Sequence, residues 1–216
     1  MPSSSVGTKV LIAFTGLALF GFLIVHLAGN LLLLSGPDAF NAYSHKLISN
    51  PLIYLAEAGL AAIFLLHVWK AGRNYGRNRA ARPERYDVKR SAGHTSRKTL
   101  SSTWMIVSGT TILVFLILHL KTFKFGAWYD ATEPGVRDIY RLTIEVFHKP
   151  GYVIWYVVAM VLVGMHLRHG ITSALQSLGA IPQGLTRTVL AAGAVIAARV
   201  AGGFALIPIW VYLFTQ

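Results

Sequence analysis

The stretch Tyr152–Gly179, YVIWYVVAMVLVGMHLRHGITSALQSLG, limits how the whole chain can fold. Its first half is continuously apolar, and its second half adds two histidines, an arginine and a glutamine. At 3.6 residues per turn, four polar side chains share one helical face: His166, His169, Ser173 and Gln176. Lipid cannot satisfy such a stripe, so we expect it to face a protein interior, a cofactor or water.

The composition of the whole chain is that of an integral membrane protein. Its 216 residues are 54% hydrophobic and only 13% charged, with a mean hydropathy of +0.54. These values are too apolar for an ordinary soluble domain. Cysteine is absent, which excludes disulfides, thiolate-held iron–sulfur clusters and covalently attached c-type haem. Any redox cofactor on this chain would have to be held by histidine or without covalent attachment.

Five apolar runs are long enough to cross a membrane, since a hydrocarbon core takes about 20 helical residues. They are residues 10–34, 52–69, 103–123, 152–173 and 188–214. The first run is too long for a signal-peptide core and has no convincing cleavage site, so we expect it to be retained. The sequence therefore predicts an all-α membrane protein in which residues 1–216 form a single five-helix transmembrane bundle.

Two connecting segments, residues 37–49 and 134–149, have apolar side chains at helical spacing. These side chains are Phe40, Tyr43 and Leu47 in the first segment and Val136, Tyr140, Thr143 and Phe147 in the second. Both segments are predicted to form short amphipathic helices that lie flat on the membrane surface. No internal repeat is evident.

The formal net charge of +12 is unevenly distributed. Ten of the 20 basic residues lie between two spans: Lys70, Arg73, Arg77, Arg79, Arg82, Arg85, Lys89, Arg90, Arg97 and Lys98. Only Glu84 and Asp87 oppose them, whereas residues 124–149 are net neutral. The positive-inside rule then predicts a cytoplasmic N-terminus and a C-terminus on the outer side. Between two spans, such a basic loop favours contact with membrane lipids or a cytoplasmic protein rather than with nucleic acid.

Each of the first four spans contains a histidine in its apolar run: His26, His67, His119 and His166. A single intramembrane histidine more often forms an interhelical hydrogen bond than a metal bond. Four of them, one per helix, require a joint explanation. With 1.5 Å of rise per residue, His26 and His119 lie about 24 Å from the inner ends of their helices. His67 and His166 lie within about 10 Å of theirs, so the two levels differ by roughly 15–20 Å.

Two histidines at one depth can supply both axial ligands of a haem iron. The depths predict an outer haem on His26 and His119 and an inner haem on His67 and His166. No span carries two histidines about four turns apart, the pattern expected when two haems share one helix pair. Glycines on the ligand faces would admit a flat macrocycle, although plain helix packing explains each of them equally well. These glycines are Gly16, Gly29, Gly109 and Gly164.

The histidines belong to a series of short motifs that extends over nearly the whole chain. The motifs are Val25-His26-Leu27 with Asn30, Ala39-Phe40-Asn41-Ala42-Tyr43-Ser44-His45, Glu57 followed by His67, His119 ahead of Phe123, His166-Leu167-Arg168-His169-Gly170, Ser173 with Gln176-Ser177-Leu178-Gly179, Gly203-Phe204 and Ile207-Pro208-Ile209. Together they resemble the single-chain, two-haem cytochrome b subunit of succinate dehydrogenase and fumarate reductase (succinate:quinone oxidoreductase). In that family the histidines matching His67 and His166 bind the proximal haem, and those matching His26 and His119 bind the distal haem.

The resemblance implies a membrane anchor of the respiratory chain and the tricarboxylic acid cycle. A flavoprotein (FAD) subunit and an iron–sulfur subunit would dock on its cytoplasmic face and carry the dicarboxylate chemistry. Electrons would pass through two b-type haems to a quinone, with menaquinone favoured, or in reverse during fumarate reduction. The implied location is the bacterial cytoplasmic membrane, spanned several times.

Other polar residues are weaker candidates for the site. The resemblance leaves Arg168 and His169 near the propionates of the inner haem, although Arg168 would equally suit lipid headgroups. Glu57, near the outer end of its span, is a candidate for proton exchange with quinone, or simply an interfacial carboxylate at a helix start. His45 and Lys46 are weaker quinone-site candidates on the same side.

Two further positions bear on the mechanism. Some fumarate reductases of this family carry a glutamate two residues before the fourth-span ligand, but Gly164 stands there in this chain, so that proton route is not expected. Arg199 lies about 18 Å into the fifth span, where we expect an interior partner or a side chain that extends to the inner face.

Two other functions remain open at this point. One is a haem b anchor for a different quinone-linked redox complex, such as a hydrogenase or a formate dehydrogenase. The other is a membrane carrier without haem that uses its histidines to move protons.

Overall fold

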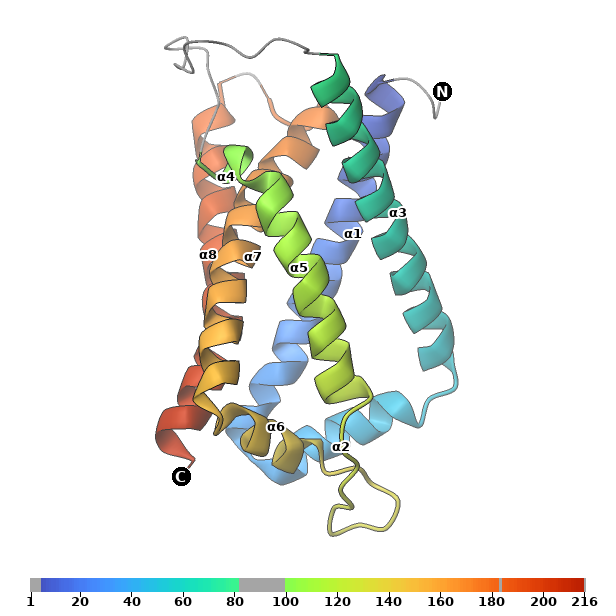
Figure 1. The fold of residues 1–216 in the computed structure, drawn as a ribbon, viewed down its shortest axis with the longest axis vertical. Helices are drawn as coiled ribbons and strands as arrows, with labels where there is room; N and C mark the ends of the chain where they lie inside the picture. The colour runs from blue at the N-terminus through green and yellow to red at the C-terminus, as the bar shows by residue number, and fades with distance from the viewer. Residues whose placement is uncertain (1–4, 82–99, 183, 216) are drawn as a thin grey trace.

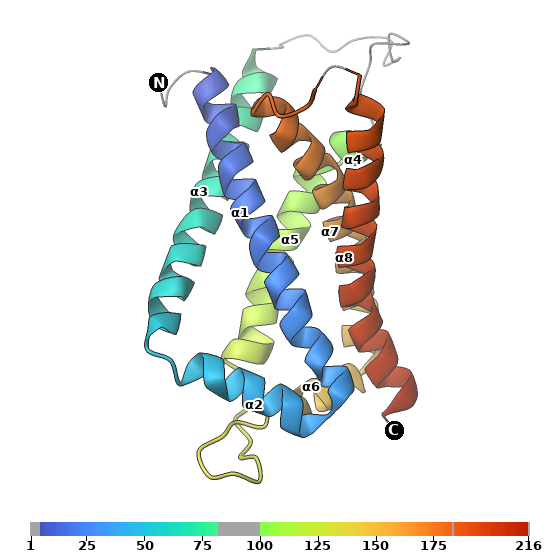
Figure 2. The same ribbon diagram turned by 180° about the vertical axis from the view of Figure 1, so that it is seen from behind.

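The computed structural model describes residues 5–81, 100–182 and 184–215 and shows a bundle of long helices (Figures 1 and 2). Five of its segments are long and apolar enough to cross a membrane. They are α1 (Ser5–Leu31) with the 3-10 turn η1 (Leu32–Ser35), α3 (Leu52–Ala80), α5 (Met105–His119) with the π-helical turn η2 (Leu120–Lys124), α7 (Pro150–Ser177) and α8 (Thr186–Phe214). The predicted helical class and the five spans are therefore confirmed, and the orientation in the membrane stays a prediction.

The two ends of the bundle differ in character. At one end α1 begins and α3 ends, and at the opposite end α8 ends (Figure 1). The first is here called the basic end, because the last turns of α3 carry Arg73, Arg77 and Arg79. Six further basic residues and two acids of the predicted basic loop lie outside the described residues: Arg82, Arg85, Lys89, Arg90, Arg97, Lys98, Glu84 and Asp87.

Helix α3 continues 11 residues beyond the predicted span end at residue 69 and stops at Ala80. The apolar pattern ends where the membrane should end, but alanine and arginine are good helix formers in water as well. Arginines near a helix C-terminus also interact favourably with the helix dipole. The apolar span and the helix therefore end at different residues.

Helices α7 and α8 pack along most of their length, and α1 lies across both of them. Small residues allow this close approach, since a Cβ atom on Gly164 would lie 3.0 Å from Cβ of Ala201. Helix α5 packs on α7, whereas α3 lies at the edge of the bundle and packs mainly on α1. Helices α3 and α5 contact each other only slightly, so α1 and α7 connect them within the bundle.

Two short helices, α2 (Pro37–Ile48) and α6 (Ile139–Phe147), cross the end opposite the basic end (Figures 1 and 2). We call this the capped end. Buried Asn41 joins the two helices: its Nδ2 donates to Oδ1 of Asp138 at 2.8 Å, and its Oδ1 accepts from the Tyr140 amide at 2.9 Å. A hydrophobic cluster packs these two helices against the ends of the long helices; it includes Leu33, Phe40, Leu142, Phe147 and Val211.

The predicted helix over residues 134–149 is wrong in its first part, because α6 begins only at Ile139. Pro134 is followed by Gly135, which has a φ of +79° and turns the chain. Asp138 then caps α6 by accepting a hydrogen bond from the Arg141 amide at 2.9 Å. Val136 is buried as predicted, but it lies in the turn rather than on a helical face. A short helix, α4 (Leu100–Thr103), precedes α5.

Candidate functional site

The structure places His26 of α1 beside His119 of α5. Their ring centroids are 5.9 Å apart, with the ring planes at 89°. Aromatic side chains surround the two imidazoles at centroid distances of 5.2–6.2 Å. These neighbours are Phe22, Phe115, Phe123, Tyr156 and Phe204. The His26–His119 pair therefore lies in an apolar, aromatic environment near the capped end.

The second pair, His67 of α3 and His166 of α7, lies nearer the basic end. They lie at one level of the bundle, because Thr15 of α1 contacts His67 and Ser108 of α5 contacts His166, each 11 residues before a histidine of the first pair. Each ring lies against a glycine of a neighbouring helix. A Cβ on Gly16 would be 3.2 Å from Cε1 of His67, and a Cβ on Gly109 would be 3.5 Å from Cε1 of His166. The two glycines leave room for the imidazoles between the helices.

Hydroxyl groups hold the Nδ1 atoms of this second pair. Thr15 Oγ1 lies 3.0 Å from Nδ1 of His67, and Ser108 Oγ lies 3.2 Å from Nδ1 of His166. Each hydroxyl already donates its own proton to a backbone carbonyl, Thr15 to Leu11 at 2.8 Å and Ser108 to Met105 at 3.1 Å. With the hydroxyl proton so placed, the oxygen accepts from the ring, and this tautomer, with the proton on Nδ1, leaves the Nε2 lone pair free.

In the first pair, the Nδ1 partner of His119 is again a hydroxyl, whereas that of His26 is an amide nitrogen. The Tyr156 hydroxyl lies 3.2 Å from Nδ1 of His119 and can accept its proton. At His26, however, the Asn30 amide nitrogen lies 3.3 Å from Nδ1 and also donates to the His26 carbonyl at 2.7 Å. A donor there favours an unprotonated Nδ1, so metal binding through Nε2 of His26 would require Asn30 to release the ring. Within the described ranges, none of the four Nε2 atoms has a hydrogen-bond partner.

The spacing between the levels of the two histidine pairs is the same along α1 and along α5. Thr15, which holds His67, precedes His26 by 11 residues on α1, and Ser108, which holds His166, precedes His119 by 11 residues on α5. With 1.5 Å per residue, both helices put the levels about 16 Å apart. The depth arithmetic from the sequence gives the same range.

These contacts reveal a weak internal repeat that the sequence reasoning missed. Thr15-Gly16 on α1 and Ser108-Gly109 on α5 each receive a histidine from another helix, and each is followed by a further histidine at the same spacing. The signal was present in the sequence as a hydroxyl residue, a glycine and an equal distance to a histidine. Tyr156 was also missed, because its sequence neighbourhood resembles any aromatic membrane helix.

The residues following His166 lie at the basic end of α7. Arg168 is exposed, and His169 is close enough to interact electrostatically with His166. Arg199 lies level with His166, since Gly164 packs on Ala201 and Gly193 packs on Thr172. Its side chain is on the exposed face of α8, so it has no interior partner among the described residues, and the other expected placement, extension to the inner face, stays a prediction. Neighbouring helices cover the α8 face made by smaller residues such as Ala197, and Arg199 projects away from it.

The three quinone-site candidates from the sequence do not form one cluster. Glu57, at the start of α3, forms an ion pair with Lys124 at the end of η2, and both side chains are about half exposed. His45 has a buried Nδ1 without a partner among the described residues, and Lys46 is exposed. No contact within the described ranges joins Glu57 to His45 or Lys46.

In the part of the chain that the structure describes, no three histidine or carboxylate side chains gather around one point. A bare metal ion held by the protein alone usually needs three or four such ligands. Paired histidines suit a metal whose remaining ligands come with the cofactor, as in a haem. Comparisons with protein-family models, curated proteins and solved structures found no match for this chain.

Proposed function

We propose that this chain is the membrane-anchor cytochrome b subunit of a succinate:quinone oxidoreductase and that each histidine pair holds one b-type haem. The observation that carries the proposal is the arrangement of four histidines from four helices as two pairs about 16 Å apart. The motif resemblance adds the identity of the complex. Histidines placed only for helix packing would not need this arrangement.

His26 and His119 are the residues that would hold a metal at the first pair. Two imidazoles that bind one metal between them would have ring centroids about 6 Å apart. The centroids of His26 and His119 are 5.9 Å apart. A proton on Nδ1 of His67 and His166, which the Thr15 and Ser108 hydroxyls can accept, would leave Nε2 of both rings available as a ligand.

Bound haem iron supplies one-electron transfer. The protein's part is to hold and orient the imidazoles and to exclude water. The hydroxyls of Thr15, Ser108 and Tyr156 orient three of the four rings. Phe115 and Phe204 help to keep the His26–His119 pair dry. The two levels then provide an electron route along the bundle axis.

The other reactants must lie outside this chain. Without cysteine the chain cannot ligate iron–sulfur clusters, so these and FAD belong to partner subunits. Arg73, Arg77 and Arg79 support docking of those subunits at the basic end, which is then the cytoplasmic side of a bacterial membrane. Electrons would leave to a quinone, with menaquinone favoured, near the capped end, where the Glu57–Lys124 pair offers a carboxylate for proton exchange.

The test is to purify the chain from its native membrane with its partners and record reduced-minus-oxidised spectra. The proposal expects a b-type signal with about two haems per chain. No b-type signal would favour the proton carrier. Mass identification of the co-purifying subunits then separates the complexes: a flavoprotein and an iron–sulfur protein with succinate activity support the proposal, whereas hydrogenase or formate dehydrogenase subunits overturn it.

A further inference from the structure

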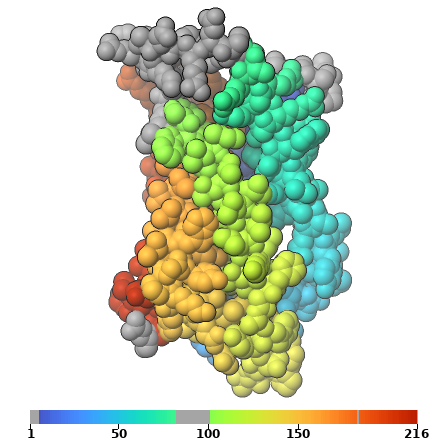
Figure 3. Space-filling view, in the orientation of Figure 1, coloured from blue at the N-terminus to red at the C-terminus, as the bar shows by residue number. Residues whose placement is uncertain are grey.

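A cavity of about 630 Å³ lies between α7 and the end of α5 with its continuation η2. It opens on the face where α5 and α7 lie side by side (Figure 3), near the capped end. Its walls include Leu118, Lys121, Lys149, Tyr152, Trp155 and Tyr156. None of these residues except Tyr156 contacts the histidine pairs, so the cavity has a chemistry of its own to explain.

Two lysines make the cavity positive. Lys121 and Lys149 form no ion pair within the described ranges, and both are exposed. Glu145 is near Lys149, but its Oε2 accepts from the Tyr129 hydroxyl at 2.6 Å and its Oε1 from Arg141 Nε at 2.8 Å. These bonds, from Tyr129 first and then Arg141, hold the pKa of Glu145 below its usual value. The acid is therefore already engaged by two other donors, and neither lysine has an ion-pair partner within the described ranges.

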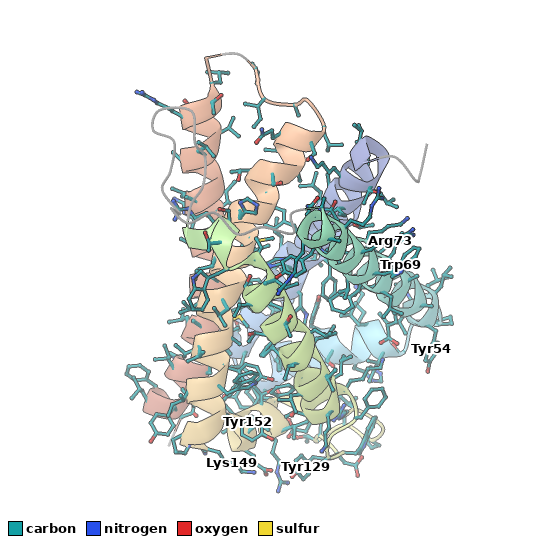
Figure 4. The ribbon with its side chains drawn as sticks, turned by 45° about the horizontal axis from the view of Figure 1, so that its top comes forward. Tyr54, Trp69, Arg73, Tyr129, Lys149 and Tyr152 are labelled. Atoms are coloured by element: carbon teal, nitrogen blue, oxygen red, sulfur yellow. The ribbon has the colours of Figure 1, made fainter. Side chains whose placement is uncertain are left out.

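The start of α7 adds to this positive charge. Lys149 precedes the helix, Pro150 is its first residue, and Gly151 lines the cavity. The first amides of a helix have no partner within the helix, and its dipole favours an anion there. Figure 4 shows Lys149 and Tyr152 together at this end of α7. The charged groups therefore converge from α7 and from η2.

A buried donor without a partner points to a missing acceptor. The indole Nε1 of Trp155 is buried and has no hydrogen-bond partner among the described residues. Trp155 packs on Phe115 in the bundle and also lines the cavity. Buried indole N–H groups nearly always find an acceptor. Because Trp155 lines the cavity, a turn of its ring would bring this N–H to a ligand oxygen there.

The rest of the cavity wall is apolar. Leu118 and the rings of Tyr152, Trp155 and Tyr156 line it, and tyrosine and tryptophan favour the boundary between hydrocarbon and water. A free phosphate ion would use the lysines but not this wall. A neutral lipid would use the wall but leave both ammonium groups without a counter-charge. One molecule that satisfies both parts has an anionic phosphate head and a hydrocarbon tail.

We propose that this cavity binds one phospholipid of net negative charge, with its phosphate between Lys121 and Lys149 and its acyl chains against Leu118 and Trp155. The site is independent of the haem proposal, because the cavity residues that bind the phosphate are not those that hold the histidines. Bound lipid would connect η2 to the start of α7 and so brace the capped end of the bundle.

The experiment uses the purified full-length protein with its partners, and native mass spectrometry follows the first bound lipid. The probes are phosphatidylglycerol and phosphatidylcholine of identical acyl chains. Wild-type protein should prefer phosphatidylglycerol, and Lys121→Gln with Lys149→Gln should reduce that preference by about five- to thirtyfold, as expected for one or two lysine–phosphate contacts. Lys9→Gln, which removes an exposed lysine of α1 outside the cavity, should leave the preference unchanged.

A second variant changes the same cavity without altering its charge, in case the lysine double variant does not fold. Trp155→Phe keeps an aromatic ring but removes the unpartnered N–H, so it should weaken the first phosphatidylglycerol site by less than the lysine double variant. Equal binding of both lipids by the wild type would overturn the proposal. So would equal losses in the Lys9→Gln and double variants, or a quinone instead of a phospholipid as the molecule that the double variant releases.

Discussion

At the scale of single residues, the most informative groups are hydroxyls next to histidines. Thr15 and Ser108 lie within hydrogen-bond distance of both a backbone carbonyl and Nδ1 of His67 or His166, so their oxygens can accept the ring proton. The sequence predicted the histidines because an intramembrane imidazole is conspicuous. It did not indicate the hydroxyls, because threonine and serine in a membrane helix usually bond only their own backbone, as Thr111 does to Val107.

The first prediction concerns Thr15. Thr15→Val keeps the shape of the side chain but removes the acceptor for Nδ1 of His67, so haem binding at the His67–His166 pair should weaken by about 10–100-fold. Haem content and redox titration of the purified protein measure this effect. Thr15→Ser should restore binding, and Thr111→Val, at a half-buried threonine of α5 whose hydroxyl bonds the Val107 carbonyl, should have no effect. Unchanged content and midpoint potential in Thr15→Val would show that the hydroxyl has no such role.

At the scale of elements, the helices were predictable and several of their ends were not. A long hydrophobic run marks a helix that lipid can surround. Five helices long and apolar enough to cross a membrane therefore appear close to the predicted positions. The end of α3 at Ala80 depends on helix propensity in water, and the start of α6 depends on a turn at Gly135 and a cap at Asp138. Turn and cap geometry are only weakly visible in an apolar pattern.

The second prediction concerns the contact between α1 and α2. A Cβ on Gly29 would lie 2.5 Å from Cε1 of Tyr43, so Gly29→Ala must displace α2 or its tyrosine. We expect a loss of about 1–3 kcal/mol in the free energy of unfolding, measured by denaturation in detergent. Gly21→Ala is the matched control on the same helix, because its Cβ would meet no atom within 4 Å. Equal effects of the two substitutions would contradict this account of the contact.

The third prediction concerns the link between α2 and α6. Asn41→Ala removes the donor to Asp138 and the acceptor for the Tyr140 amide, leaving partly buried polar groups without partners. The expected destabilisation is about 1–3 kcal/mol by the same assay. Asn78→Ala, at an exposed site of α3, should change stability much less. A wild-type unfolding curve for Asn41→Ala would mean that other contacts hold the capped end together.

At the scale of the whole molecule, the paired histidines follow from topology. All four histidines lie late in their spans, and successive spans run in opposite directions, so the first and third spans share one level and the second and fourth share the other. Depth alone does not specify which side chains meet, because helix rotation is set by packing. The structure supplies that rotation, with His26 beside His119 and His67 within electrostatic range of His166.

Arg199 shows where whole-molecule reasoning from sequence is weakest. An arginine within an apolar span suggests an interior partner, yet its position on α8 faces away from α7. Its rotation depends on which small residues of α8 pack on α7, here Ala197 and Ala201. Several small residues along α8 could have formed that contact, so the sequence did not determine the exposed face.

The most direct test of the central claim is the spectrum of the haem that remains in single histidine variants. His67→Ala and His166→Ala should each leave one and the same b-type haem, with the same absorption maximum and midpoint potential. His26→Ala and His119→Ala should each leave the other one. The pairing would be contradicted if the His67 and His26 variants lost the same haem, or if His169→Ala removed a haem that His166→Ala retained.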